Sequence, residues 1–437
     1  MLKSICNIYC NLDAHHELFI TLTVVSLLIV FGVLTFGENQ VITIWSWRSQ
    51  DAAVWQEVQK DMNAQGIPIE IHFTAFAPTQ YFAKLTLALE SKTGPDIAYV
   101  GRFPTPLMES YATSGSILPL NGEVNFSNFP QWILKQATYN GKVYGVPYAV
   151  QVLGIFYNKD IYNHYNLSVP KTWDDLIENA KILKAHGVIP FAISGDVQFT
   201  LAMQHAMCGV SILGPEWIKK LIDGETDFLS PKWVELNTLL DNLKIYYQPG
   251  FIADNEAARD SLFAFGKAAM VFYGSWGYQI WKQLNPNINV GYFMVPPLST
   301  DQKPYAYAYM DGAIAMTSSC NNKDMALKLL NFVASPEFGS IFANITYNLP
   351  AVEGSKLPND PLFEKVFSTY EHNVSPYVYW VGSVFVTQTP SLYEDVLSPG
   401  MQKMYAGKIT PEQFAQMAED AISKWYTPLQ EYLKNKK

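Results

Sequence analysis

The sequence predicts an α/β fold divided into two or three lobes, and three observations carry this prediction. Short β-branched runs alternate with amphipathic runs in the first hundred residues after an apolar start, which is typical of strands joined by crossover helices. The 437 residues exceed what one hydrophobic core usually supports. Hydrophobic residues make up 49% and charged residues 16%, which indicates a globular chain.

The first part of the chain supplies the alternation. The run VITIWSW alternates and is β-branched, and Asp51 then opens a run with Val54, Trp55 and Val58 on one helical face. The predicted elements are, in order, a strand at 41–47, a helix from Asp51, a strand at 67–73, a helix at 80–89 and a strand at 96–100. This β-α-β-α-β order predicts a sheet with crossover helices.

The middle of the chain continues the pattern. An Asn-Gly turn between apolar runs at 139–162 predicts a hairpin that leads into a long extended segment. Thr172 with Asp175 predicts a capped helix. Further elements are predicted as a strand in FAISGD, a helix from Asp254 to Phe265 that stops at Gly266, a strand in AAMVFY, a turn at Gly274-Ser275, a helix at 276–284 and an extended run at 305–316.

The stretch FAFGKAAMVFYGSWGYQIW at 263–281 divides between core and surface. Its Gly-Lys pair lacks the first glycine and the Ser or Thr of a phosphate-binding loop. Ligands of open α/β sheets bind at the carboxyl ends of strands, where Trp276 begins a helix. We therefore assign Phe263, Phe265, Met270 and Phe272 to the core, and place Tyr273, Ser275, Trp276 and Tyr278 at an edge open to a ligand.

Composition also restricts the partners. A net charge of −9 argues against nucleic acid, because phosphate binding relies on Lys and Arg. Aromatic residues make up 14%, and Tyr and Trp pair a flat apolar face with a polar edge that suits polyhydroxylated ligands. The four cysteines show no zinc spacing, and Cys208 and Cys320 are predicted to be buried thiols. We predict no cofactor.

The amino terminus carries an uncharged apolar run at 18–36, which is long enough to span a bilayer as a helix. Small residues near Gly37 also allow cleavage there. We predict that residues 1–37 are a signal peptide or an N-terminal membrane anchor, and that the remainder is exported to the periplasm or the cell surface.

Several segments together resemble the extracellular solute-binding proteins of ABC transporters, specifically the carbohydrate group that includes maltose-binding protein. The segments are GPDIAYV (94–100), NGKVYGVPYAVQVLGIFYNKDIY (140–162), KTWDDLIENAKILKAHG (171–187), FAFGKAAMVFYGSW (263–276), DGAIAMTSS (311–319) and LPA (349–351). Their order and spacing, rather than any one of them, make the resemblance specific, and it covers nearly everything after Gln40.

The resemblance implies two α/β lobes around a ligand cleft with a multi-strand hinge. Residues 38–149 and 311–350 would form the N-terminal lobe, and residues 150–310 and 351–437 the C-terminal lobe. The chain would cross between lobes near Val150, near Met310 and within 351–362. The lobes of such proteins close on a ligand and the closed form docks on a membrane permease. The implied partners are therefore a carbohydrate, ABC permease subunits and, through the N-terminal segment, the membrane, with a monomeric chain.

The resemblance also implies a set of ligand contacts, position by position. Gln151 stands where maltose-binding proteins place an acidic sugar contact, and Trp276 matches a tryptophan on which a sugar ring stacks. Tyr393 and Trp380 compete for a second stacking position. The full expected set is Trp47, Arg48, Ser49, Gln80, Arg102, Gln151, Asp196, Gln198, Phe199, Ser275, Trp276, Tyr309, Asp311, Trp380 and Tyr393.

Other functions stay open beside a non-enzymatic sugar receptor. The same fold could bind a polyamine, a metal or a phosphate, and clustered tyrosines near Asp311 could bind ferric iron. A glycoside hydrolase would need two cleft carboxylates, for which only Asp196 and Asp311 qualify. A sensing ectodomain would need a cytoplasmic output module, which the 17 residues before the apolar run do not provide.

Overall fold

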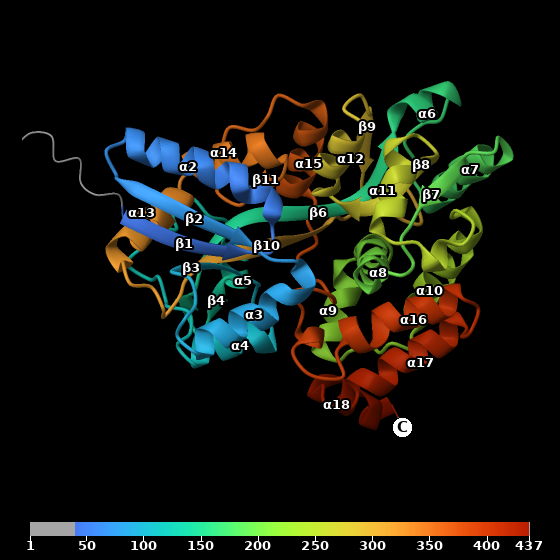
Figure 1. The fold of residues 1–437 in the computed structure, drawn as a ribbon. Helices are drawn as coiled ribbons and strands as arrows, with labels where there is room; N and C mark the ends of the chain where they lie inside the picture. Colours follow the sequence, from blue (N-terminus) through green and yellow to red (C-terminus); the bar gives the residue numbers. More distant parts are fainter. Residues whose placement is uncertain (1–39, 437) are drawn as a thin grey trace, which may run out of the picture.

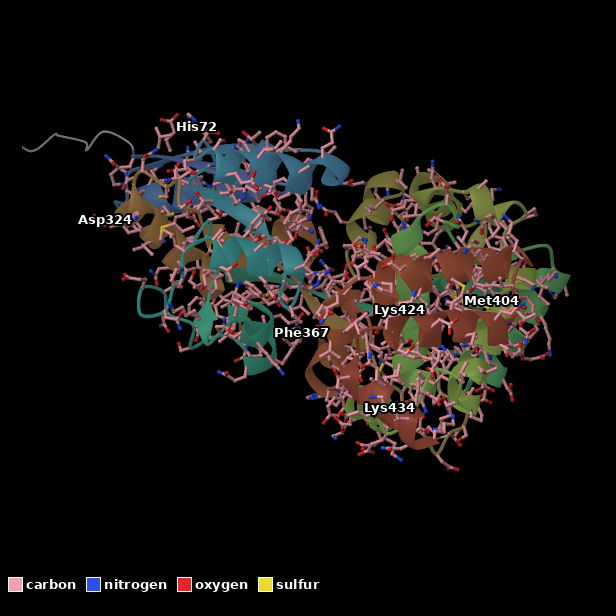
Figure 2. The ribbon with its side chains drawn as sticks, turned by 90° about the horizontal axis from the view of Figure 1, so that it is seen from below. His72, Asp324, Phe367, Met404, Lys424 and Lys434 are labelled. Carbon is pink, nitrogen blue, oxygen red and sulfur yellow. The ribbon has the colours of Figure 1, made fainter. Side chains whose placement is uncertain are left out.

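The computed structural model describes residues 40–436, which form two lobes joined by long strands (Figure 1). The predicted signal peptide or anchor, with Cys6 and Cys10, lies outside the described residues. Within residues 40–436, no helix combines the length and the apolar character needed to cross a bilayer. Seen from below, His72 and Asp324 mark one lobe, Met404 and Lys434 mark the other, and Phe367 lies where the lobes meet (Figure 2).

One sheet runs through both lobes in the order β2-β1-β3-β10-β6-β8-β7, with β11 and β9 also paired to β6. β1 lies parallel to β2 and β3, whereas β10 is antiparallel to both β3 and β6. The strands are β1 (Gln40–Ser46), β2 (Ile69–Ala75), β3 (Ile97–Val100), β6 (Val146–Asn158), β7 (Ile189–Ala192), β8 (Ala268–Gly274), β9 (Val290–Phe293), β10 (Tyr307–Met316) and β11 (Leu349–Pro350), with a separate hairpin of β4 (Thr138–Tyr139) and β5 (Lys142–Val143).

Helices surround each half of this sheet. We call the half around β1 to β3 the first lobe and the half around β7 to β9 the second lobe. Helices in the first lobe are α2 (Ala52–Ala64), α3 (Pro78–Glu90), α4 (Pro106–Thr113), α5 (Gln131–Gln136), α13 (Lys323–Val333) and α14 (Pro336–Thr346). Helices in the second lobe are α6 (Lys159–His164), α7 (Trp173–Ala185), α8 (Gln198–Ile212), α9 (Pro215–Asp223), α10 (Pro231–Leu243), α11 (Glu256–Ala264), α12 (Gly277–Leu284), α15 (Pro361–His372), α16 (Ser398–Tyr405), α17 (Pro411–Ile422) and α18 (Thr427–Lys436).

Local signals in the sequence account for most of these elements. The face of α2 that carries Val54, Trp55 and Val58 is buried, as its spacing predicts. Thr172 and Asp175 form a complete capping box at the start of α7. Asn140 and Gly141 both adopt positive φ between β4 and β5, which is the geometry that the Asn-Gly turn predicts.

The connection between the lobes is built from β6, β10 and β11. β6 is 13 residues long and nearly all buried, and it pairs with β10 and β11 near Val150 before pairing with β8 and β9 further along. The chain then passes from β11 to α15, which packs against β9. The exact lobe boundaries at 149/150, 310/311 and 350/351 stay a prediction.

One core assignment is wrong. Phe263, Met270 and Phe272 are buried, but Phe265 is 57% exposed. Phe265 is the residue that follows α11, immediately before Gly266 with its φ of 67°, so its side chain leaves the helix at the turn instead of pointing inward. The placement at an open edge is also wrong for Tyr273, Ser275 and Tyr278, which are all buried, whereas Trp276 is half-buried. Cys208 and Cys320 are buried free thiols, as predicted.

Candidate functional site

The expected contact residues follow the carboxyl ends of four strands. Arg48 follows β1 and Arg102 follows β3 in the first lobe, whereas Asp196 follows β7 and Trp276 follows β8 in the second. Parallel strands end at a common edge, where backbone polar groups and side chains face a ligand crevice. The topology therefore brings loops that are far apart in sequence to one region beside the hinge strands.

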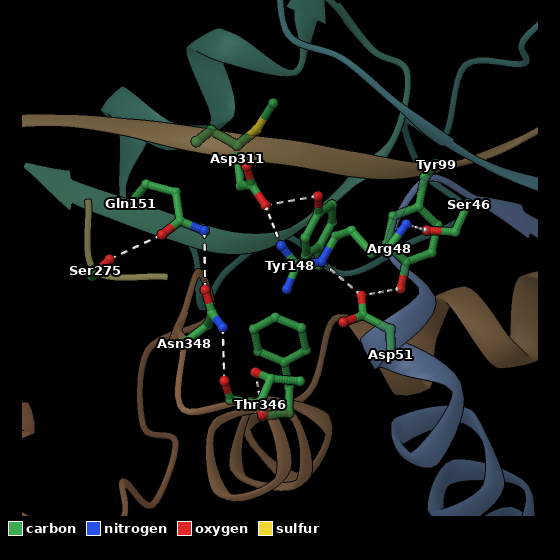
Figure 3. A network of polar contacts seen from close by, with 12 residues as sticks. Ser46, Arg48, Asp51, Tyr99, Tyr148, Gln151, Ser275, Asp311, Thr346 and Asn348 are labelled. Carbon is green, nitrogen blue, oxygen red and sulfur yellow. Dashed lines mark hydrogen bonds and ion pairs between the residues drawn. The ribbon is translucent and has the colours of Figure 1, made fainter. Parts of the chain in front are cut away.

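Arg48 is the centre of a buried ionic network (Figure 3). Its Nε donates to Asp51 Oδ2 at 2.9 Å and its Nη1 to Asp311 Oδ2 at 2.9 Å. Tyr99 donates its hydroxyl to Asp51, and Tyr148 donates its hydroxyl to Asp311. Burial alone would lower the pKa of Arg48, but the nearby Asp51, Tyr148 and Asp311 raise it, so the guanidinium stays charged.

Asp311 reaches Arg48 because β10 carries a bulge. The pairing of β10 with β6 shifts register on both sides of Gly312, and Asp311 has no partner in the ladder. A bulge re-aims the side chain it carries, here toward the first lobe. Gly312 is required beside it, because a Cβ there would lie 2.6 Å from the carbonyl oxygen of Val100.

Gln151 connects three segments at the hinge. Its Nε2 donates to Asn348 Oδ1 at 3.1 Å, and its Oε1 accepts from Ser275 Oγ at 2.9 Å (Figure 3). The three residues lie on β6, just before β11 and just after β8. Gln151 is 1% exposed, so in this conformation its amide serves the hinge. Ser275 Oγ also accepts the N–H of Val152.

Arg102, from the first lobe, lies against strand β10. Its Nη1 donates to the carbonyl oxygens of Met310 at 3.0 Å and Asp311 at 2.9 Å. Its guanidinium carbon lies 4.6 Å from the centroid of the Tyr309 ring, within the range of a cation–π contact. Its buried Nε has no hydrogen-bond partner among the described residues.

Aromatic rings continue from Tyr309 into the second lobe. Trp380 lies 6.1 Å from Tyr309, 5.8 Å from Tyr393 and 5.4 Å from Phe199, all between ring centroids. Phe199 lies 6.1 Å from Trp276. We call Phe199, Trp276, Tyr309, Trp380 and Tyr393 the aromatic cluster. Trp380 is fully buried, whereas Phe199, Trp276 and Tyr393 are half-buried, so three of the five rings keep accessible surface.

The Trp276 ring occupies the space that a side chain at Gly274 would need. A Cβ on Gly274 would lie 1.7 Å from Cζ3 of Trp276, which means that the indole rests on the glycine backbone. The other flank of the ring contacts Tyr273 at 4.8 Å between centroids. The turn after β8 therefore needs glycine to hold the indole in this position.

The remaining expected contacts are less tightly grouped. Trp47 packs edge-on against Tyr81 and Tyr99 and tilts on Phe82. Ser49, Gln80 and Asp196 are exposed on the loops after β1 and β7 and on α3. Gln198 begins α8, and its side chain lies outside what the structure describes.

Three residues of this region carried no sequence signal. Tyr148 and Asn348 complete the networks of Arg48 and Gln151, and Gln136 accepts the N–H of Met310 at 3.3 Å. Each acts through a partner that is more than 150 residues away in the chain. Only the pairing of β6, β10 and β11 could have identified them.

The two carboxylates that were expected as candidates for a hydrolytic pair have different surroundings. Asp311 is engaged by Arg48 and Tyr148, and Asp196 is exposed on the other lobe. Within residues 40–436, no group of three or more His, Cys, Asp or Glu could hold a metal ion. Apolar ring faces and hydrogen-bond donors are what this region presents to a ligand.

Comparison with known proteins decides the family. A sequence model described as "Bacterial extracellular solute-binding protein" matches residues 46–339. This chain belongs to that family. Its members are extracellular binding proteins, so the chain is a solute-binding protein of ABC transport.

Individual relatives agree with this assignment. The "Multiple sugar-binding protein" of Streptococcus mutans is 24% identical over 363 residues, which cover 79% of this chain and 82% of that protein. A solved "Chitin oligosaccharide binding protein" has a TM-score of 0.72 at 22% identity, covering 91% of this chain and all of that one. The structure of RafE in complex with raffinose has a TM-score of 0.72 at 19% identity, covering 90% of this chain and 100% of that one. These structures share the two-lobed fold.

Proposed function

We propose that this solute-binding protein captures a sugar or oligosaccharide between its lobes and delivers it to an ABC transporter permease. The observation that carries the proposal is the aromatic cluster. Its rings come from the crossing strand β10 and from three separate segments of the second lobe, and Arg102 of the first lobe lies on one of them.

The chemistry of a sugar fits this arrangement. A pyranose ring presents a patch of C–H bonds that stacks on an aromatic face, and hydroxyls around its rim that need hydrogen-bond partners. Phe199, Trp276 and Tyr393 keep accessible ring surface, and Arg102 offers donors. The relatives named for sugars, chitin oligosaccharides and raffinose support the same ligand class.

The hinge supports lobe closure. Residues 38–149 with 311–350 and residues 150–310 with 351–437 are proposed to move as two bodies. The connections between them are the strands β6 and β10 and the chain that follows β11. Bending of a few residues in such connections is how two-lobed binding proteins close on a ligand. Asp51 and Asp311 are committed to Arg48, which leaves little negative charge for a polyamine.

A thermal-shift screen against mono- and oligosaccharides tests the proposal, with spermidine, phosphate and ferric iron as non-sugar probes. A ligand that binds only the folded state stabilises it by about 2.7 kcal/mol at a hundredfold excess over its Kd. We expect a rise in Tm with one class of saccharide. Small-angle X-ray scattering should then show a smaller radius of gyration with that saccharide. A rise with spermidine or iron alone, or turnover of a chromogenic glycoside, would contradict the proposal.

A further inference from the structure

The chain has only three arginines, Arg48, Arg102 and Arg259, among 30 basic residues. All three lie in the interior or at the hinge, whereas the chain uses lysine elsewhere. Arginine differs from lysine by a planar guanidinium whose Nε and Nη2 form a fork that matches the two oxygens of a carboxylate. We therefore compare the partners of the three guanidinium groups to infer which chemical group Arg102 could bind.

Arg259 shows the fork in use. This fully buried side chain holds Asp260 through Nε–Oδ1 at 3.2 Å, Nη2–Oδ1 at 3.0 Å and Nη2–Oδ2 at 2.9 Å. Its guanidinium also lies 3.7 Å from the Tyr273 ring centroid. Arg259 therefore shows a buried arrangement in which the fork binds a carboxylate and a tyrosine ring lies under the guanidinium.

Arg48 is also held by carboxylates, but not through its fork, because its buried Nη2 has no hydrogen-bond partner among the described residues. Its Nε donates to a carboxylate oxygen of Asp51 and its Nη1 to a carboxylate oxygen of Asp311. The two acidic side chains are thereby committed to Arg48.

Arg102 differs from the other two arginines because no carboxylate contacts its guanidinium among the described residues. Its Nη1 is fixed by two backbone carbonyl oxygens and its guanidinium lies over Tyr309, as that of Arg259 lies over Tyr273. Its Nε is buried and has no hydrogen-bond partner among the described residues, and the hydrogen bonds that the guanidinium makes to these residues come from Nη1. The side chain is held in place with its carboxylate-binding edge unused. A buried donor without an acceptor is costly, so a bound molecule that supplies one gains affinity.

We propose that the ligand carries a carboxylate, which the Nε/Nη2 fork of Arg102 binds in the way that Arg259 binds Asp260. This inference rests on the proposed sugar-binding function and narrows it to acidic saccharides, such as oligomers of a uronic acid. The carboxylate binds at Arg102 while the sugar rings contact the aromatic cluster, which Arg102 reaches through Tyr309.

A matched pair of probes tests the inference on the unaltered protein. Isothermal titration calorimetry would compare trigalacturonate, oligomannuronate, glucuronate and N-acetylneuraminate, each with its methyl ester. The methyl ester keeps the sugar ring, but it removes the negative charge and the two equivalent oxygens that the fork would bind. We expect at least one free acid to bind tenfold or more tightly than its ester, and the preference to weaken with added salt.

Two variants locate the effect. Arg102→Lys keeps the charge and removes the fork, and Arg102→Gln removes both. Both should weaken binding of the acid at least tenfold and binding of its ester by a smaller factor, so that the acid-to-ester ratio falls toward one. Lys408→Gln, an exposed change on the second lobe, should alter neither. Because Arg102 also holds backbone carbonyls of β10, Tm of each variant is measured, and the acid-to-ester ratio of the unaltered protein stands independently of folding.

The possible results distinguish the carboxylate inference from the sugar-binding function. If neutral saccharides bind as tightly as acidic ones, the carboxylate inference is overturned and the sugar-binding function stands. If only a non-sugar acid such as citrate binds, and Arg102→Lys abolishes that binding, the carboxylate inference stands and the sugar-binding function fails. Tighter binding of sugar phosphates than of uronates would overturn the carboxylate assignment, as would the absence of binding by every acid.

Discussion

Arg48 and Arg102 follow the neighbouring strands β1 and β3, yet their surroundings differ. Arg48 is 5% exposed and is surrounded by two carboxylates and two tyrosine hydroxyls that pair with one another. Arg102 is half-buried and contacts two backbone carbonyls and a ring, and its Nε has no hydrogen-bond partner among residues 40–436 whose side chains the structure describes. Removing a charge that is paired within the protein should therefore cost stability, whereas the charge of Arg102, which no carboxylate of the described residues pairs, is the one that we propose a ligand contacts.

The largest effect should come from breaking the paired network. Arg48→Ala leaves Asp51 fully buried without its cation, and removing one partner of a buried pair costs about 3–5 kcal/mol. Urea denaturation should show this loss, while Arg102→Ala should cost far less. Equal losses for the two variants would remove the distinction between a structural and a ligand-binding arginine.

Trp276→Ala should weaken ligand binding and leave the stability of the fold unchanged. Loss of an aromatic contact at a binding site costs roughly 2 kcal/mol of affinity, and the ring is half-buried and so lies at the margin of the core. Calorimetry with the saccharide found by the screen should show this loss at an unchanged Tm. Unchanged affinity would exclude Trp276 from the site.

Gly274→Ala should weaken binding by a smaller amount, roughly 1 kcal/mol, because it displaces the indole without removing it. The test is a double-mutant cycle, because Gly274→Ala should have no further effect on affinity once Trp276 is alanine. Additive losses would mean that Gly274 acts through the backbone and does not position Trp276.

An effect of similar size, but on stability, should come from Gln151→Leu, which leaves Asn348 and Ser275 without this partner at a cost of about 1 kcal/mol. If Gln151 serves the hinge, affinity should change through the balance of open and closed forms, which scattering of the free protein detects. A tenfold loss of affinity with no change in scattering would make Gln151 a direct ligand contact instead.

The sequence determined the elements of this protein and the family to which it belongs. Periodicity predicted β1, α2, β2, α3 and β3 in order, and local chemistry predicted the capping box of α7 and the Asn-Gly turn. Such features depend on residues a few positions apart, so they can be read directly from the chain. Phe265 was misassigned because a residue that ends a helix can turn either way, and apolar character alone does not decide which.

Only the tertiary structure decided which polar side chains are engaged. Arg48, Arg102, Gln151 and Asp311 were all expected to contact a ligand on equal terms, and nothing in their neighbours separates them. The bulge at Asp311 and the pairing of β6 with β10 and β11 give Arg48, Asp311 and Gln151 side-chain partners within the protein, whereas Nε of Arg102 has no partner among the described residues. Whether a donor has a hydrogen-bond acceptor depends on groups that folding brings together from distant parts of the chain. The sequence alone does not show which of these groups come within hydrogen-bond distance.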